Sequence, residues 1–364
     1  MRFMLVGLVA PFAEKEKMLA DFEEAQSLVR TFGGEVFAAS SQNNVRADNA
    51  TYIGKGKAQE IADTISKEKI DIVVINDTVK PGQLFTLKKI FERSNQEIMV
   101  WDRVELILQI FSKHAATSEA KLQIRLAQMR HMGPRIFGMG MVMSQQGGGI
   151  GTRGIGETNT ELMQRHWRDE MKQVRIQLSK LIQTRQQQIN RRKRSGLLTV
   201  SIVGYTNAGK TTLFNALAKE KNLVENSLFI TLDSNVSKIY LPSLAKEVYL
   251  SDTIGFIQKL PPQLIEAFKS TLMETVQADL ILHVIDTSDP WLNDKIETVE
   301  KVLFELGCNT KKQIYVFNKL DLAKTVNINF LSEKYKQYKP QFVEANSGKG
   351  CNELKEAIQK LIMQ

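Results

Sequence analysis

Residues 204–211 read Gly-Tyr-Thr-Asn-Ala-Gly-Lys-Thr. This stretch follows the apolar run Leu197–Val203, which is typical of a strand, and precedes Thr212–Leu217, which is typical of the start of a helix. A glycine loop that ends in Lys-Thr between a strand and a helix is the P-loop arrangement, in which backbone N–H groups surround nucleotide phosphates. Chance matches that also have the strand and the helix in place are rare. The sequence therefore predicts a nucleotide-binding α/β domain around this loop.

The residue types in the loop each have a physical role. Glycines let the backbone turn its N–H groups toward the phosphates, and the N-terminus of the following helix adds partial positive charge. Lys210 supplies a mobile positive charge for the outer phosphates, and the hydroxyl of Thr211 is a ligand for Mg²⁺. The predicted phosphate-binding residues are Gly204, Asn207, Ala208, Gly209, Lys210, Thr211 and Thr212.

Length and composition are those of an ordinary globular protein, since the 364 residues are 43% apolar and 24% charged. Two or three domains are expected from this length. The two cysteines, Cys308 and Cys351, form no CxxC pair, which argues for a reducing compartment and against a structural zinc. The run Phe3–Phe12 contains a proline and is read as a first strand rather than a signal peptide, and no run is long enough to span a membrane. We expect a cytoplasmic protein, and an association of part of it with membranes stays open.

Positive charge is concentrated in one stretch. The net charge is +9, and residues 161–196 hold ten Lys or Arg against three acidic residues, which is +7 of that total. Such a stretch is typical of a surface that binds nucleic acid or an anionic membrane. A solvated helix face explains the charge equally well if the stretch is considered alone.

The first hundred residues alternate between strand-like and helix-like patterns, which predicts a parallel sheet. The segment 52–57 (YIGKGK) lacks P-loop spacing, and a surface turn is the preferred interpretation over an anion site. The predicted strands are 3–9, 35–39, 70–75 and 97–100, and the predicted helices are 14–30, 58–67 and 81–93.

Residues 101–195 are predominantly helical. Helices are expected at 101–113 and 119–132, with a break at Gly133-Pro134, and a long helix at 157–194. The long helix has apolar residues three or four apart, close to a heptad seam, so the region is predicted to form an antiparallel helical hairpin. The seam residues are Met163, Trp167, Met171, Val174, Leu178 and Leu181.

The glycine-rich loop 144–158 between these helices formally contains GxGxxG. No strand precedes it and no βαβ unit surrounds it, so a dinucleotide fingerprint is rejected. We expect instead a loop tip whose bare backbone, with Arg153 at its centre, approaches a phosphate-rich surface.

After the hinge 191–196, strands and helices alternate again. The predicted strands are 197–203, 246–250, 280–285, 313–317 and 341–343, and the closing helix is 352–363. The expected domains are an N-terminal α/β domain at 1–105, the helical hairpin at 106–196 and a C-terminal P-loop domain at 197–364.

Three later stretches distinguish GTP from ATP. Asp252-Thr253-Ile254-Gly255 follows the end of a predicted strand. At this place in GTPases an aspartate holds Mg²⁺ through a water molecule, and the glycine contacts the γ-phosphate. Asn318-Lys319-Leu320-Asp321 follows another strand. The carboxylate of Asp321 accepts from the N1–H and N2–H₂ of guanine, which adenine does not offer. Asn318 is expected to bridge back to the P-loop, and the stem of Lys319 to pack on the base.

The third stretch, 229–233, contains Thr231, the expected switch threonine, which Mg²⁺ and the γ-phosphate would order. In this order and spacing the motifs predict a G domain. Phe256 stands where many GTPases have a water-orienting glutamine, so unaided hydrolysis is expected to be slow. Phe229 and Ala345 complete the predicted nucleotide-binding residues. Lys210, Thr231 and Gly255 are the predicted catalytic residues, and Thr211, Thr231 and Asp252 are the predicted Mg²⁺ ligands.

Several stretches are similar to those of one known family: 52–57 (YIGKGK), 101–108 (WDRVELIL), 146–154 (QGGGIGTRG), 156–158 (GET) and 252–256 (DTIGF). On these residues the whole chain resembles the HflX family of ribosome-associated GTPases. The resemblance implies an N-terminal region that reaches into the large ribosomal subunit, a factor that separates or rescues stalled ribosomes, and ribosomal RNA as the partner of residues 144–194. We expect a monomer.

The sequence also departs from the family pattern. Gln145, Ile155 and Asn159 replace the usual Arg, Pro and Lys, which makes the loop tip less basic. Residues 234–238 (SNVSK) replace the usual switch sequence, and Glu344 replaces a serine in the pair that supports guanine. The sequence given stops with the closing helix, so we do not expect the extension that many relatives carry after it. A GTP-gated RNA-binding protein with a non-ribosomal target is the alternative, and a dinucleotide-dependent enzyme is not favoured.

Overall fold

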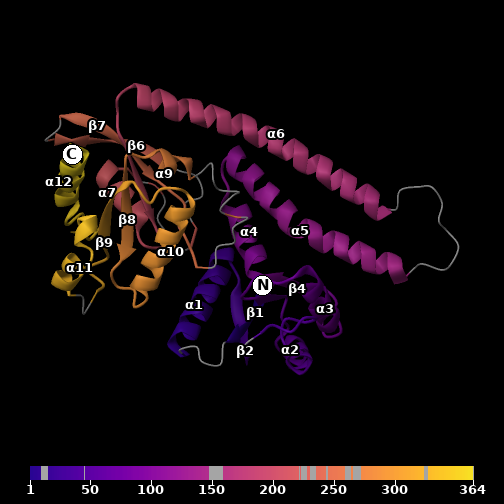
Figure 1. Cartoon of the computed structure of the whole chain (residues 1–364). Coiled ribbons are helices and arrows are strands. Elements are labelled where there is room, and N and C mark those ends of the chain that lie inside the picture. The colour runs from indigo at the N-terminus through magenta and orange to yellow at the C-terminus, as the bar shows by residue number, and fades with distance from the viewer. Residues whose placement is uncertain are drawn as a thin grey trace. The chain divides into compact units, whose positions relative to one another are not determined.

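The computed structural model describes residues 1–9, 15–44, 46–146, 159–220, 222, 228–229, 235–242, 245–258, 264, 272–323 and 327–363. For residues 15, 136–146, 159 and 160 only the helical backbone is described. The chain divides into two compact units (Figure 1). Unit one comprises 1–113, 121–179 and 261–267, and unit two comprises 114–120, 180–260 and 268–364. The three-domain division expected from the sequence stays a prediction.

Unit one contains a four-stranded sheet in the order β2-β1-β3-β4, in which every pair of neighbours is parallel. The predicted parallel sheet is therefore confirmed. Helices cover both of its faces, because the inner strands β1 and β3 are apolar on both sides. Met4 and Val6 pack with α2 and α3, whereas the ring of Phe3 contacts Phe32 at the end of α1. The elements are β1 (Arg2–Val9), α1 (Lys15–Phe32), β2 (Glu35–Asn43), α2 (Lys55–Glu68), β3 (Ile72–Ile75), α3 (Pro81–Phe91) and β4 (Met99–Asp102).

The segment 52–57 differs from the surface turn expected for it. Tyr52 and Ile53 are buried, and the Tyr52 hydroxyl lies 2.9 Å from Asp77 Oδ2. Helix α2 begins at Lys55, three residues earlier than predicted, so the two lysines of the segment lie in its first turn. The prediction of a surface turn was wrong because the aromatic and isoleucine side chains turn into the core.

Helix α4 (Arg103–His114) leads to the two long helices, α5 (Ser118–Gln146) and α6 (Asn159–Arg194). The predicted helix break at Pro134 is wrong, since α5 continues through it. Buried ion pairs hold the residue that follows the proline, because Arg135 lies 2.5 Å from Asp102 and 3.1 Å from Glu105. Tertiary contacts of this kind can offset the hydrogen bond that a proline removes from a helix.

Asp102 is the centre of this buried charge network. Burial works to raise the pKa of its carboxyl, but the hydrogen bond from His131, 3.0 Å away, and the charge of Arg135 lower that pKa overall. Asp102 Oδ1 also accepts from the amide of Glu105, in the first turn of α4. The stretch 101–108 therefore connects the sheet edge to the first arm of the hairpin.

Helices α5 and α6 run antiparallel, as predicted. Trp167 Nε1 donates to Met129 O at 3.1 Å, and Arg125 pairs with Glu170 at 2.6 Å. In unit two, Glu119 at the start of α5 pairs with Arg185 near the end of α6. Of the seam residues, Val174 and Leu178 are buried, whereas Met163 is exposed.

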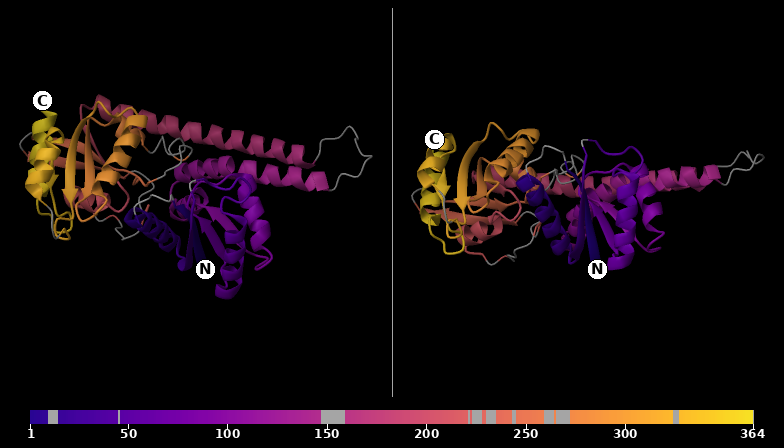
Figure 2. Two further views of the ribbon diagram at one scale, coloured as in Figure 1. Left: turned by 60° about the horizontal axis from the view of Figure 1, so that its bottom comes forward. Right: turned by 90° about the horizontal axis from the view of Figure 1, so that it is seen from below.

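Unit two contains a six-stranded sheet in the order β10-β9-β8-β5-β7-β6. Figure 2 shows the strands of this unit, mostly in orange, from two further directions. All neighbours are parallel except β6 and β7, which are antiparallel. The carboxyl ends of β5, β7, β8 and β9 therefore lie at one edge, where a doubly wound sheet binds ligands. The elements are β5 (Thr199–Gly204), α7 (Lys210–Ala218), β6 (Asn235–Leu241), β7 (Lys246–Asp252), α9 (Met273–Gln277), β8 (Leu280–Asp286), α10 (Leu292–Glu305), β9 (Lys312–Asn318), α11 (Ile328–Lys334), η2 (Lys336–Tyr338), β10 (Gln341–Phe342) and α12 (Cys351–Ile362).

The edge strand β6 was not predicted. Its exposed Val236, Lys238 and Tyr240 alternate with less exposed residues, and half of the strand is polar. Among the residues that the structure describes, no helix is long and apolar enough to cross a membrane.

Candidate nucleotide-binding site

The P-loop lies where predicted, between the end of β5 at Gly204 and the start of α7 at Lys210. Two of its glycines are required by geometry. Gly204 has φ +156°, and a Cβ there would lie 2.3 Å from Val284 O. Gly209 has φ +90°, and its Cβ would lie 2.3 Å from Asn318 Nδ2. Neither position accepts a side chain, so the backbone can approach a ligand closely.

Lys210 is buried at the first position of α7, and its ammonium donates to Tyr205 O at 2.8 Å. Burial lowers the pKa of this lysine from 10.5 to about 8, against the opposing effect of Asp252, and the positive charge of Lys319 lowers it further. Because nearby negative charge neutralises this buried ammonium only in part, the ammonium attracts phosphate oxygens strongly.

Thr211 and Asp252 provide two oxygen atoms suited to a divalent cation. Asp252 ends β7 and is fully buried, and its Oδ2 accepts from the Thr211 hydroxyl at 2.8 Å. A hydroxyl and a carboxylate are hard oxygen ligands, which is the donor set that Mg²⁺ prefers. The residues present therefore fit the predicted metal.

The segment after β7 is joined directly to the P-loop. Thr206 N donates to Phe256 O at 2.6 Å, and Phe256 N donates to Gly204 O at 3.1 Å. A Cβ on Gly255 would lie 2.8 Å from Thr206 Cα and 2.9 Å from Lys210 Nζ. The Phe256 ring is 1% exposed, so this residue packs in the core. Any movement of Gly255 must therefore act on the P-loop.

Asn318 bridges the base-recognition segment to the P-loop, as predicted. Its Nδ2 donates to Ala208 O and its Oδ1 accepts from Ala345 N, both at 3.0 Å. Lys319 follows with φ +62°, and its ammonium lies 2.6 Å from Asp286 Oδ2. Asp321 is exposed, which leaves its carboxylate accessible to a ligand. A direct bond from the Ala345 amide to the base stays a prediction.

The unexpected charge of Glu344 has a partner that sequence reasoning missed. Lys349 lies 2.8 Å from Glu344 Oε1, and Ser347 Oγ donates to Oε2 at 3.1 Å. The hydrogen bond from Lys349 lowers the pKa of Glu344 below its usual range, and burial opposes that shift only in part. Glu344 and Lys349 also form an antiparallel backbone bridge, which closes the turn 344–349. A lysine five residues after the glutamate was the signal available in the sequence.

Of the remaining predicted site residues, some lie beside the P-loop and others lie outside the described residues. Phe229 is buried, and its amide donates to Thr206 Oγ1 at 3.1 Å, so this residue also contacts the P-loop. Thr212 lies in the first turn of α7. Thr231 and the glycine-rich residues 147–158, with Arg153, lie outside the described residues.

The basic cluster Arg191–Arg194 divides into two pairs of residues. Arg192 lies 2.6 Å from Glu274, whose side chain is 3% exposed, and Lys193 donates to Gln277 at 2.5 Å. Both acceptors belong to α9. Arg191 and Arg194 are exposed, so these two are the residues of the cluster best placed to meet an external phosphate.

Three family models match the chain in succession. The model described as GTP-binding GTPase N-terminal matches residues 20–112, and the one described as GTP-binding GTPase Middle Region matches 114–192. The model described as 50S ribosome-binding GTPase matches 199–319, which includes the P-loop, Asp252 and Asn318.

Similar proteins agree with these matches. The chain is 41% identical to the GTPase HflX of Caldanaerobacter subterraneus subsp. tengcongensis, over 99% of this chain and 80% of that protein. It is 35% identical to the GTPase HflX of Escherichia coli (strain K12), over 96% of this chain and 81% of that protein. A GTP-binding protein of Sulfolobus solfataricus, crystallised with GDP, shares the fold with a TM-score of 0.52 at 22% identity, over 100% of this chain and 99% of that one. The chain therefore belongs to the GTPase HflX family and is a GTPase.

Proposed function

We propose that this GTPase binds the large ribosomal subunit or the whole ribosome in its GTP state, splits or rescues stalled ribosomes, and hydrolyses GTP when the ribosome stimulates it. The observation that carries the proposal is the continuity of the site with the basic helix. The P-loop follows β5, and β5 follows directly on α6, whose exposed Arg191 and Arg194 suit an RNA backbone. The matching model described as a 50S ribosome-binding GTPase supports the same partner.

In this proposal the phosphates lie over the N-terminus of α7, where backbone amides and Lys210 bind them. Thr211 and Asp252 would hold Mg²⁺, which when bound neutralises charge that develops on the phosphates. Asn318 fixes the distance between the P-loop and the base, through its two hydrogen bonds to Ala208 and Ala345. The exposed carboxylate of Asp321 selects guanine.

Release would follow hydrolysis. Gly255 is packed against Thr206 and Lys210, so the loss of the γ-phosphate at this point changes the contacts of the segment after β7. This segment continues toward α9, where Glu274 pairs with Arg192 of the basic helix. The proposed RNA contacts of residues 144–194 would weaken as these contacts change.

The test is sedimentation of the purified protein with separated ribosomal subunits. We expect the protein to co-sediment with large subunits in the presence of a non-hydrolysable GTP analogue, and to remain in the supernatant with GDP. Equal sedimentation with both nucleotides would contradict the proposal. Failure to bind either subunit, with RNA binding retained, would instead favour a GTP-gated RNA-binding protein with a different target.

A further inference from the structure

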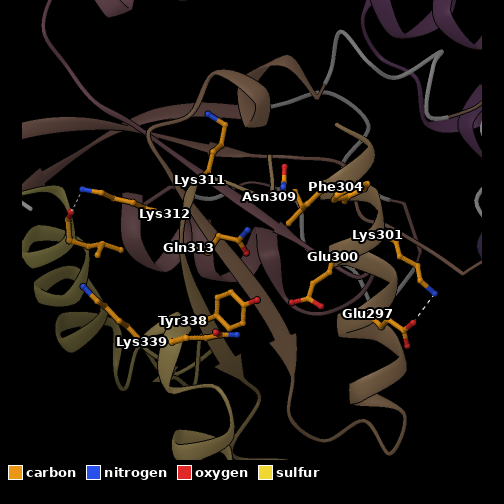
Figure 3. Close-up of a pocket in the computed structure, with 13 residues that line it drawn as sticks. Glu297, Glu300, Lys301, Phe304, Asn309, Lys311, Lys312, Gln313, Tyr338 and Lys339 are labelled. Carbon is orange, nitrogen blue, oxygen red and sulfur yellow. Dashed lines mark hydrogen bonds and ion pairs between the residues drawn. The ribbon is translucent and has the colours of Figure 1, made fainter. Parts of the chain in front are cut away.

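A cavity of unit two lies away from the candidate nucleotide-binding site. It has a volume of about 590 Å³ and lies between α10, the start of β9 and η2 (Figure 3). Strand β9 begins at Lys312, which lines this cavity, and ends at Asn318, which contacts the P-loop. A strand of this length spans about 20 Å, so the cavity is separate from the nucleotide site. We propose that this cavity binds an unpaired nucleotide of single-stranded RNA, with its base inside and the neighbouring phosphates at the rim.

Lysines supply the charge that phosphates need. Lys311 donates to Ala278 O at 2.7 Å and Lys312 donates to Leu361 O at 3.1 Å. Both acceptors are neutral carbonyls, so these hydrogen bonds orient the ammonium groups without cancelling their charge. Lys339 at the end of η2 also lines the cavity and is exposed. The opening is therefore positively charged along one side.

The two acidic residues of the cavity each have a partner within the protein, but only one of these partners is a cation. Glu297 lies 2.7 Å from Lys301, one turn further along α10. Glu300 accepts a hydrogen bond from the neutral hydroxyl of Tyr315, which orients its carboxylate and leaves its negative charge in place. Lys311, Lys312 and Lys339 outnumber this one carboxylate along the cavity, so a phosphate at the rim is attracted to the lysine side.

Aromatic side chains provide surfaces on which a base can stack. Tyr338 stacks on Tyr315 with ring centroids 4.0 Å apart and an interplanar angle of 2°, which gives the cavity a rigid wall. Phe304, on α10 at the rim, is 68% exposed. An exposed phenyl ring beside cationic side chains is the combination with which proteins bind single-stranded nucleic acid.

An amide group in the cavity can recognise the edge of a base. Gln313 Oε1 is buried, and it has no hydrogen-bond partner among the residues that the structure describes. Figure 3 shows Gln313, Glu300 and Tyr338 pointing toward one another within the cavity. An acceptor in this position is matched by an N–H group of a base, and unpaired bases of RNA present such groups.

These observations favour a nucleotide over simpler anions. Inorganic phosphate would use the lysines but neither Phe304 nor Gln313, and an acidic peptide would leave the aromatic surface unused. A nucleotide within a strand uses all three groups at once, because its phosphates extend beyond the base on either side. The proposal does not depend on ribosome binding, since it concerns direct binding of RNA to this surface.

The first test is photocrosslinking of the full-length, GDP-loaded protein to a ten-nucleotide RNA that carries 5-iodouridine. We expect a crosslink to Phe304 or Tyr338. The Phe304→Ala variant should weaken binding of the same RNA, measured by fluorescence anisotropy, by about tenfold, because a stacked base is lost. Phe330 is the matched control, since it is 60% exposed on α11 and lies outside the cavity. Phe330→Ala should bind RNA as the wild type does.

The second test uses the salt dependence of RNA affinity to ask whether the cavity lysines contact phosphates. The double variant Lys312→Gln/Lys339→Gln should lower the slope of log affinity against log salt concentration by about 1.4, the value for two phosphate contacts of a single strand. The control Lys238→Gln/Lys336→Gln removes two other surface lysines of unit two and should lower it less. Equal effects of test and control variants, or crosslinks confined to other residues, would overturn the proposal. Displacement of the RNA by an equal concentration of free uridine monophosphate would also overturn it, because the ligand would then be a free nucleotide.

Discussion

Lys210 shows how a single buried residue couples nucleotide binding to protonation. Its burial lowers the pKa of its ammonium to about 8 in the nucleotide-free protein, whereas the unfolded chain keeps the ordinary value of 10.5. Between these two values the unfolded state binds more protons than the folded state does. The nucleotide-free protein is therefore expected to gain stability as the pH rises from about 8 toward 10.5.

Nucleotide binding should respond to pH in the opposite direction. The phosphates interact favourably with the charged form of Lys210, so GTP affinity should fall as the pH rises above about 8, at a rate that approaches tenfold per pH unit. The measurement is a titration with a fluorescent GTP analogue at several pH values between 7 and 9.5. Lys210→Met is the control. This variant should bind the analogue more weakly at every pH and should lack the fall in affinity above pH 8. Any fall that comes from deprotonation of the guanine ring should appear in both proteins. An unchanged wild-type affinity over this range would show that Lys210 is charged throughout.

Asp321 carries the predicted base selectivity. In the variant Asp321→Asn an amide donor replaces one carboxylate acceptor, and this change matches the carbonyl of xanthine rather than the amino group of guanine. We expect the variant to lose GTP affinity and to gain affinity for xanthosine triphosphate. Because Asp321 is exposed, the substitution should leave the thermal unfolding midpoint nearly unchanged. A variant that still prefers GTP would contradict the assignment of Asp321.

At the scale of the elements, sequence patterns predicted best where local and tertiary preferences agree. β3 is a short buried run, β5 is followed at once by glycines, and α12 is strongly amphipathic, so each was placed to within two residues. Pro134 was wrongly interpreted as a helix break, and Lys349 was missed as the partner of Glu344. The reason is that distant partners determine their roles: Asp102 holds the helix turn after Pro134, and Glu344 pairs with Lys349 across a turn. Edge strand β6 was missed because half of its residues face solvent.

Helix α6 contributes to the folded G domain through one arginine of its basic cluster. Arg192→Ala would leave the carboxylate of Glu274 buried without its cation, which costs about 3 kcal/mol in comparable pairs. Arg191→Ala, the exposed neighbour, should change the free energy of unfolding by less than about 0.5 kcal/mol. Urea unfolding of the two variants tests this difference. The double variant Arg192→Ala/Glu274→Gln should regain much of the free energy of unfolding that Arg192→Ala loses, because it no longer contains the buried, unpaired carboxylate.

The exposed arginines of the cluster, Arg191 and Arg194, should instead contribute to RNA binding. Arg191→Ala/Arg194→Ala is expected to weaken association with large ribosomal subunits and to reduce its salt dependence by about two counterions. The control Lys172→Ala/Lys180→Ala removes two other lysines of α6 and shows whether position or total charge matters. If both double variants lose the same affinity, the helix contributes a diffuse field and no specific phosphate contact.

At the scale of the whole molecule, the chain combines a P-loop GTPase domain with the long helices α5 and α6. Membership of the family accounts for the GTPase activity. The exposed Arg191 and Arg194 of α6 support the proposed ribosomal partner. The four central strands place the residues predicted to bind the phosphates, the metal and the base at one edge of the sheet. The glycine-rich loop, one of the stretches that resemble the family, lies outside the described residues.

The chemistry of hydrolysis gives the last prediction. Phe256 follows the Asp-x-x-Gly motif, and its ring is buried while its backbone pairs with Gly204 and Thr206. A buried phenyl ring cannot orient the attacking water, so the protein alone should hydrolyse GTP slowly. In other GTPases a group supplied in trans increases the rate by about 10³–10⁵. We expect large ribosomal subunits to increase the single-turnover rate of this protein by at least about a hundredfold.

Phe256→Leu separates packing from chemistry in this experiment. Leucine fills most of the same buried volume, and the substitution leaves the backbone pairing intact, so the variant should lose some stability and still respond to the large subunit. Lys210→Ala should abolish hydrolysis in both conditions, because the phosphates lose their buried cation. Fast hydrolysis by the protein alone, unchanged by the subunit, would mean that this chain orients the water itself, through residues other than Phe256. The ribosome would then be a binding partner without a part in the chemical step.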